Sequence, residues 1–79
     1  MSVENIAVIG SGQMGSGIAQ VASLSGYNVI LIDIKEEYLL NAIKSIEYSL
    51  GKFVSKEKIT SEDADKAIKN IITTTDINK

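Results

Sequence analysis

The sequence predicts an α/β fold built on a parallel β-sheet, and three apolar runs support this prediction. The runs Asn5 to Ile9 and Asn28 to Ile32 are short, rich in β-branched residues and followed by a glycine or an acid. The run Ile71 to Thr75 is β-branched throughout. The first two are near-continuous apolar runs, typical of strands buried on both faces of a parallel sheet, and the third is predicted as a strand from its β-branched residues. Helical periodicity separates the three runs, so the expected element order is β-α-β-α-α-β.

The first helix is expected from Gln13 to Ser25, because two stripes of residues recur there at helical spacing. One stripe is apolar and the other consists of small residues: Met14, Ile18 and Val21 in the first, and Gly15, Ala19 and Ala22 in the second. Small side chains would let the helix axis lie close to the sheet. Gly26 follows as a natural C′ residue.

About 38 residues separate the second run from the third, whereas a parallel crossover needs only about a dozen. One apolar stripe in this segment follows a helical period over four turns: Leu39, Ile43, Ile46, Leu50 and Phe53. A break is expected around residues 54–59, after which Thr60 or Ser61 caps a further helix. We therefore predict an inserted helical pair between the second and third strands, with the apolar stripe in the core.

The motif that carries chemistry joins the first strand to the first helix and reads Gly10-Ser11-Gly12-Gln13-Met14-Gly15. In this strand–turn–helix context, Gly-x-Gly-x-x-Gly is typical of dinucleotide binding. The first glycine permits the tight turn, the second lets the backbone approach a pyrophosphate, and the third lets the helix pack against the strand. Free amides of the first helical turn favour the phosphates. We predict a Rossmann-type fold, of which this chain holds the N-terminal half, with cofactor contacts from all six residues.

Asp33 ends the second strand, 18 residues after Gly15. This is close to the spacing of about 20 for the acid that binds the adenosine ribose. A carboxylate accepts hydrogen bonds from the ribose hydroxyls and repels a 2′-phosphate. NADP sites usually offer an arginine here, and the chain has none, although Lys35 is nearby. We therefore predict NAD as the cofactor and NADP as the less favoured alternative.

Composition restricts the remaining function classes. The 79 residues include no cysteine and no histidine, which excludes thiolate metal sites and a histidine base supplied by this chain. The net charge of −2 and the scattered lysines do not resemble a nucleic-acid-binding surface. No apolar run approaches the length of a membrane span, and no signal-peptide pattern opens the sequence. We expect no metal, no nucleic acid and no membrane partner, and a cytoplasmic location.

Residues 6–22 read Ile-Ala-Val-Ile-Gly-Ser-Gly-Gln-Met-Gly-Ser-Gly-Ile-Ala-Gln-Val-Ala, and this run resembles the N-terminus of 3-hydroxyacyl-CoA dehydrogenases, including 3-hydroxybutyryl-CoA dehydrogenases. The Met-Gly-x-Gly-Ile-Ala-Gln continuation is more specific than the glycine pattern. Related β-hydroxyacid dehydrogenases share the glycine turn but tend to lack this continuation, and often lack an acid at the position of Asp33. The resemblance extends through the paired helices to residues 74–76, and so covers nearly the whole chain.

The resemblance implies reversible oxidation of an (S)-3-hydroxyacyl-CoA to the 3-ketoacyl-CoA, with hydride passing to nicotinamide C4. In the family, a His–Glu pair, a Ser and an Asn that act on the substrate lie further along than residue 79, so no catalytic residue can be assigned here. The helical pair helps to receive the acyl-CoA. Ser49 and Lys56 match positions that contact CoA in the family, although a solvated helix position and an ordinary loop lysine are the alternatives.

These inferences describe residues 1–79 as the N-terminal portion of a dinucleotide-binding domain, without the rest of that domain and without the family's C-terminal helical domain. The chain alone is expected to be inactive. Because a three-strand sheet leaves an edge unpaired, self-association or a complementing polypeptide is expected. The alternative functions are a non-catalytic dinucleotide-binding module and a subunit of a split enzyme; a purely structural domain has no positive support in the sequence.

Overall fold

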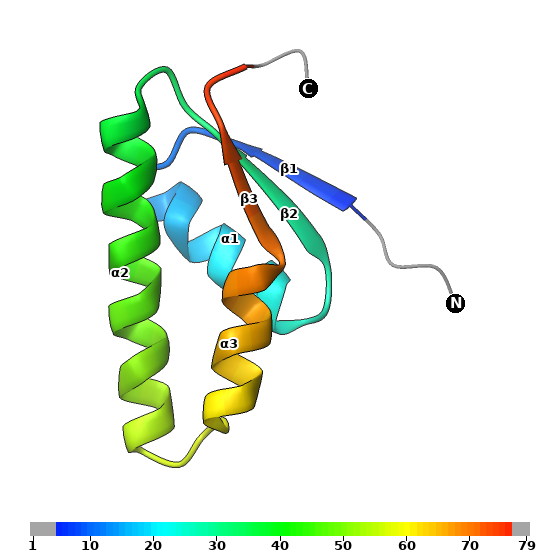
Figure 1. Ribbon diagram of the computed structural model, residues 1–79, viewed down its shortest axis with the longest axis vertical. Coiled ribbons are helices and arrows are strands. Elements are labelled where there is room, and N and C mark those ends of the chain that lie inside the picture. Colours follow the sequence, from blue (N-terminus) through cyan, green and yellow to red (C-terminus); the bar gives the residue numbers. More distant parts are fainter. Residues whose placement is uncertain (1–4, 77–79) are drawn as a thin grey trace.

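The computed structural model describes residues 5–76, which form a helical layer packed on a parallel sheet (Figure 1). The sheet has the order β1-β2-β3, and its strands are β1 (Asn5–Ile9), β2 (Asn28–Ile32) and β3 (Ile71–Thr74). The helices are α1 (Gln13–Leu24), α2 (Glu36–Ser55) and α3 (Ser61–Lys69). The predicted fold class and element order are confirmed. The first helix and the third strand each end one residue earlier than expected.

One face of the sheet forms the core with the helices. In the parallel register Ile6 pairs with Val29 and Val29 with Ile71, and the row two residues further on contains Val8 and Leu31. These side chains pack against the inner faces of the helices, where the largest buried residues include Ile46 and Leu50. The shortest dimension of the molecule, 17 Å, is that of two layers. The predicted core stripe of α2 is confirmed, with Leu39 also buried and with Ile43 and Phe53 partly buried against the same cluster.

The opposite face of the sheet carries no helix among residues 5–76. Its cross-strand row is Ala7, Ile30 and Ile72, and the side chains of Ile9 and Ile72 are 69% and 60% exposed. The prediction that the first strand is buried on both faces is therefore wrong for β1 in this structure. The strands follow one another in one direction across the sheet. Right-handed crossovers then place all of the connecting helices on one face.

Helix α1 lies on the sheet through its small residues. Ala19 is fully buried and Ala22 nearly so, whereas Met14 is 80% exposed and Val21 is also exposed. The larger apolar stripe of the helix thus faces away from the core, and the stripe of small residues makes the contact. Gly26 follows the helix with a φ of +97°, as expected of a C′ glycine.

The α2–α3 pair forms a helical hairpin whose turn lies beyond the amino ends of the strands (Figure 1). Glu57, with a φ of 59°, occupies the left-handed position after α2. The amides of Glu57 and Lys58 donate to the carbonyls of Val54 and Phe53, which is the Schellman pattern. Thr60, one of the two predicted caps, closes a capping box with Asp63 at the start of α3. No helix within residues 5–76 combines the length and the apolar character needed to cross a membrane.

Candidate functional site

The glycine turn and Asp33 meet at the carboxyl ends of β1 and β2. The amide of Gly10 donates to the carbonyl of Ile32 at 2.7 Å, which continues the pairing of the two strands into the turn. The amide of Ser11 donates to Asp33 Oδ2 at 2.8 Å, and the Ser11 hydroxyl donates to the same oxygen at 2.5 Å. Residues 22 positions apart in the sequence are therefore joined by two hydrogen bonds.

The Asp33 carboxylate is held in its ionised form. Donation from the Ser11 hydroxyl, and then from the amides of Ser11 and Ile34, lowers the pKa of Asp33 below its ordinary value. The Ile34 amide donates to the other oxygen, Oδ1, at 2.7 Å. An ionised carboxylate offers about four acceptor positions. Three protein donors leave capacity for a ligand hydroxyl.

At two positions of the turn, the structure of the protein itself explains why the residue is glycine. Gly10 has a φ of +94°, a region that favours glycine. A Cβ on Gly15 would lie 1.9 Å from the carbonyl oxygen of Gly10, an overlap with backbone that no side-chain movement could relieve. A Cβ on Gly12 would meet no protein atom within 4 Å. Packing within residues 5–76 therefore gives no reason for glycine at position 12.

The amino end of α1 differs from the other two helix starts. Gly12 is the N-cap residue; it supplies no side-chain cap, and no acid lies in the first turn, which contains Gln13, Met14 and Gly15. By contrast, α3 has a capping box, and α2 has Glu36 and Glu37 in its first turn. Among residues 5–76, no side chain caps the first-turn amides of α1. Together with the dipole, they can accept an anion.

A polar groove of about 450 Å³ runs from this turn between α1 and α2. Its walls are formed mostly by small and polar side chains, which include Gln13, Ser16, Gln20, Asn41, Ser45 and Ser49. The buried Ser16 hydroxyl donates to the carbonyl of Ser11 at 3.0 Å and so fixes the turn against α1. Gln20 Nε2 donates to Ser49 Oγ at 2.9 Å, between the two walls.

The nine residues singled out from the sequence fall into two groups. The six residues of the turn and Asp33 lie together at the carboxyl end of the sheet. Ser49 lies in the polar groove, and Lys56 lies at the C-cap of α2, two turns further on and away from the glycine turn. Neither Ser49 nor Lys56 contacts Asp33 or the turn through any hydrogen bond described for residues 5–76.

The hydrogen bonds that Ser16 and Gln20 make in the structure were not predicted from the sequence. A signal for Gln20 was available, since it ends the Gly-Ile-Ala-Gln continuation of the motif. No local pattern pointed to Ser16, because its partner is the turn backbone five residues earlier.

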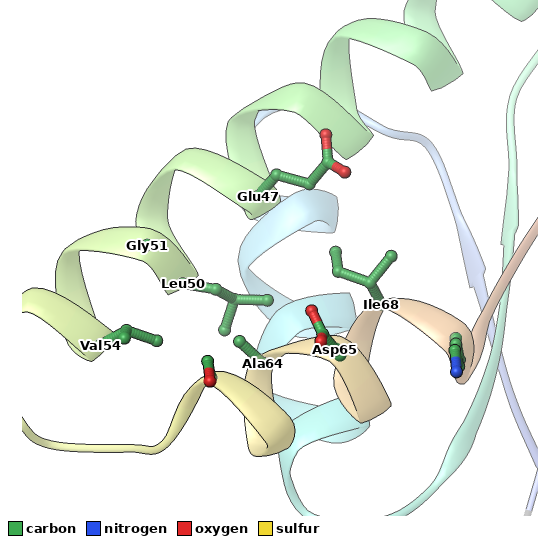
Figure 2. A pocket seen from close by; sticks show the side chains of 9 residues that line it. Glu47, Leu50, Gly51, Val54, Ala64, Asp65 and Ile68 are labelled. Atoms are coloured by element: carbon green, nitrogen blue, oxygen red, sulfur yellow. The ribbon is translucent and has the colours of Figure 1, made fainter.

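A second hollow, of about 460 Å³, lies between α2 and α3 (Figure 2). Leu50, Val54 and Ile68 give it apolar walls, and Glu47 on α2 and Asp65 on α3 flank it. None of the nine predicted cofactor- and substrate-binding residues lines it. Within the described part of the chain, no group of three or more acidic side chains could hold a metal ion.

Comparison with known proteins places the chain in a family. Residues 5–79 match the family described as "3-hydroxyacyl-CoA dehydrogenase, NAD binding domain". The 3-hydroxyadipyl-CoA dehydrogenase of Escherichia coli is 44% identical over 78 residues, which are 99% of this chain and 16% of that protein. The human mitochondrial hydroxyacyl-coenzyme A dehydrogenase is 42% identical, over 94% of this chain and 25% of its own length.

A solved structure supports the same family relationship. The (S)-3-hydroxybutyryl-CoA dehydrogenase of Ralstonia eutropha superposes with a TM-score of 0.91 at 32% identity, over 95% of this chain and 26% of that one. The chain thus spans a quarter or less of the length of these two curated relatives. The match over almost all of its residues nevertheless means that the chain belongs to the NAD-binding domain family of the 3-hydroxyacyl-CoA dehydrogenases.

Proposed function

We propose that this chain is the NAD-binding portion of an oxidoreductase that interconverts (S)-3-hydroxyacyl-CoA and 3-ketoacyl-CoA by hydride transfer. Residues 1–79 would form the N-terminal portion of its dinucleotide-binding domain. The observation that carries the proposal is the meeting of the glycine turn with an ionised Asp33, which Ser11 holds through two hydrogen bonds. When bound, NAD supplies the nicotinamide ring that exchanges the hydride.

In this proposal the turn from Gly10 to Gly15 binds the pyrophosphate. The first-turn amides of α1 donate to its oxygens, and the open space beside Gly12 is where the phosphates approach the backbone. Gln13 and Met14 begin the helix at this point and would line the cofactor. The remaining acceptor position of Asp33 would receive a hydroxyl of the adenosine ribose.

The charge of Asp33 supports NAD over NADP. Its lowered pKa keeps the carboxylate ionised at neutral pH, and an anion at this place repels a 2′-phosphate. Calorimetry with both cofactors tests the proposal. We expect NAD to bind and NADP to bind much more weakly. Asp33→Ala should lower NAD affinity by about 10- to 100-fold, the effect of losing hydrogen bonds to a charged group.

Asp65→Ala, which removes the same charge from α3, is the matched control and should bind NAD normally. Equal affinities for NAD and NADP, or an Asp33→Ala variant that binds NAD as tightly as the wild type does, would contradict the assignment of Asp33.

We further propose that the acyl-CoA substrate contacts α2 through Ser49 and Lys56. Ser49 opens on the polar groove that begins at the glycine turn, and Lys56 continues the same face of α2 two turns later. A lysine at that place can meet a phosphate as a point charge. The sequence contains no histidine and no cysteine, so this chain supplies neither residue for the proton transfer.

The chain alone should therefore be inactive with NAD and 3-hydroxybutyryl-CoA. An enzyme assay that follows NADH absorbance checks this, and turnover by the purified chain would contradict it. A cytoplasmic location is part of the same proposal and can be checked by cell fractionation, since the relatives include mitochondrial and peroxisomal proteins.

A subunit of a split enzyme is a second candidate function, and the sheet supports it. The outer edge of β1 has no partner strand among residues 5–76, and Ile9 and Ile72 are exposed on the open face. In the doubly wound strand order a fourth strand lies beside the first. Co-expression with a polypeptide that carries the remaining length of a relative should then give turnover, and Ile9→Lys should abolish it. Turnover that is indifferent to Ile9→Lys would argue against this surface.

A further inference from the structure

The side chain of Gln20 joins the two helices that border the polar groove. Its Nε2 donates to Ser49 Oγ at 2.9 Å, across 29 positions of the sequence. Both side chains are half-buried. Gln20 ends the Gly-Ile-Ala-Gln continuation of the motif. It lies two turns into α1, so dinucleotide binding at the glycine turn does not explain its presence. The contact therefore needs another explanation.

The direction of this hydrogen bond determines what the Ser49 hydroxyl can do. A serine hydroxyl has one donor and two acceptor positions. A helical serine commonly donates to a carbonyl of its own helix, as Ser23 donates to Gln20 within α1. The hydrogen bonds of residues 5–76 include none donated by Ser49. Gln20 fills one acceptor position, so the hydroxyl hydrogen remains available.

The surroundings of Ser49 favour an anionic acceptor. Lys52 and Lys56 lie three and seven residues further along α2, on the same helical face. The Nζ atom of Lys52 lies 4.7 Å from the centroid of the Tyr48 ring, which fixes this charge beside the helix. Lys52 and Lys56 line a neighbouring hollow of α2 rather than the groove of Ser49. A hydroxyl donor on the same helical face as two lysines suits a phosphoryl oxygen better than a neutral carbonyl.

We propose that Gln20 is a positioning residue for the CoA part of the substrate. It holds the Ser49 hydroxyl with its hydrogen free to donate to a phosphoryl oxygen of CoA. This inference rests on the proposed function, in which α2 receives the acyl-CoA. The same helix would then serve both ligands: the amino end of α1 binds the dinucleotide, and Gln20, about 12 Å further along the axis, orients the residue that binds CoA.

The experiment titrates CoA and NAD separately into the full 79-residue chain and its variants, with calorimetry as the readout. Gln20→Ala should lower CoA affinity by about 2- to 10-fold, the usual effect of one hydrogen bond. Gln20→Glu should lower it by about 10-fold or more. Its carboxylate only accepts, so it would take the Ser49 hydrogen, and its charge would repel the phosphate. NAD affinity should stay unchanged in both variants.

A double-mutant cycle separates positioning from independent contact. Gln20 acts through Ser49, so Gln20→Ala combined with Ser49→Ala should bind CoA no more weakly than Ser49→Ala alone. Pantetheine, which lacks the phosphates, should bind equally well to the wild type and to Gln20→Ala. Val21→Ala, at the next position of α1 but exposed on the outward side, is the control and should leave both affinities unchanged.

Four outcomes would overturn the proposal: wild-type CoA affinity in Gln20→Glu, additive losses in the double variant, loss of NAD binding together with CoA binding in the Gln20 variants, or a wild-type chain that binds NAD but not CoA at millimolar concentration. The last result would leave the dinucleotide assignment intact. If the wild-type chain bound neither ligand, the proposed function would fail as well.

Discussion

The two faces of the sheet are alike in sequence and different in structure. Ile71 and Ile72 are neighbours in β3, yet Ile71 is 9% exposed against the helices and Ile72 is 60% exposed on the open face. Along β1, Val8 is buried and Ile9 is exposed in the same way. The strands therefore carry apolar residues for two covered faces, whereas residues 5–76 cover only one. Apolar patterning thus indicates which surfaces are suited to burial, but it does not identify the segment or partner that covers them.

The largest effect is expected where the covered face is most crowded. Gly15→Ala would place a Cβ 1.9 Å from the Gly10 carbonyl oxygen. Because the obstacle is backbone, we expect a loss of about 3 kcal/mol or more in the free energy of unfolding. For a small domain with one core, such a loss could prevent folding altogether. Circular dichroism during urea denaturation measures it.

Gly17→Ala is the matched control, two residues along the same helix. A Cβ there would meet nothing within 4 Å. Replacing a glycine inside a helix should raise stability by about 0.5–1 kcal/mol. If Gly15→Ala and Gly17→Ala behaved alike, the close approach of α1 to the turn would be wrong.

The next prediction compares the stability contributions of the two sheet faces within one strand, β3. Ile71→Ala removes a buried side chain from the core and should cost about 2–4 kcal/mol. Ile72→Ala, one residue along, should cost at most about 1 kcal/mol, mainly through β-propensity. Equal losses in urea denaturation would mean that the open face is covered in solution, for instance by a second copy of the chain. Repeating the measurement at several protein concentrations would detect such association.

Sequence patterns predicted the elements well because their causes are local. The bounds of β1 and β2 followed from apolar runs, and the start of α3 from the capping preference of Thr60. The break around residues 54–59 was predicted, but the positive φ of Glu57 within it was not, since a non-glycine residue at positive φ has no local signature. The bare face of the sheet could not be predicted either, because it depends on strand order.

The candidate site likewise has features that the sequence predicts and features that it does not. The glycine spacing and Asp33 were visible in the sequence, and the structure brings them together at one end of the sheet. The two donations from Ser11 that hold the carboxylate, and the contact of Gln20 with Ser49, are long-range. Such contacts depend on how strands and helices pack, so the motif continuation could draw attention to Gln20 but could not reveal its partner.

A smaller effect is expected in the helical hairpin that covers the core face. Thr60→Ala removes the hydroxyl that accepts from the Asp63 amide at 3.1 Å. Loss of a threonine cap should cost about 1 kcal/mol. Ser61→Ala, at the next exposed position, is the control and should be nearly neutral. Thermal denaturation followed by circular dichroism measures both. A neutral Thr60→Ala would mean that α3 contributes little to covering the sheet.

The smallest stability effect concerns Asp33, which lies at the carboxyl end of the sheet beside the glycine turn. The direction of its pKa shift determines how this effect changes with pH. The Ser11 hydroxyl, the largest cause, and the Ser11 and Ile34 amides lower the pKa of Asp33 in the folded chain. A lowered folded pKa contributes stability that is fully present above the unfolded pKa of about 3.9 and is lost as the pH falls through the folded pKa. The stability difference between the wild type and Asp33→Asn should therefore be constant near neutral pH and shrink below about pH 4. Ser11→Ala removes the largest cause, so it should weaken this pH dependence without abolishing it, because the two amide donors remain. A difference that grew on acidification would mean that Asp33 is held in its protonated form, and would contradict its assignment as the acceptor of a ribose hydroxyl.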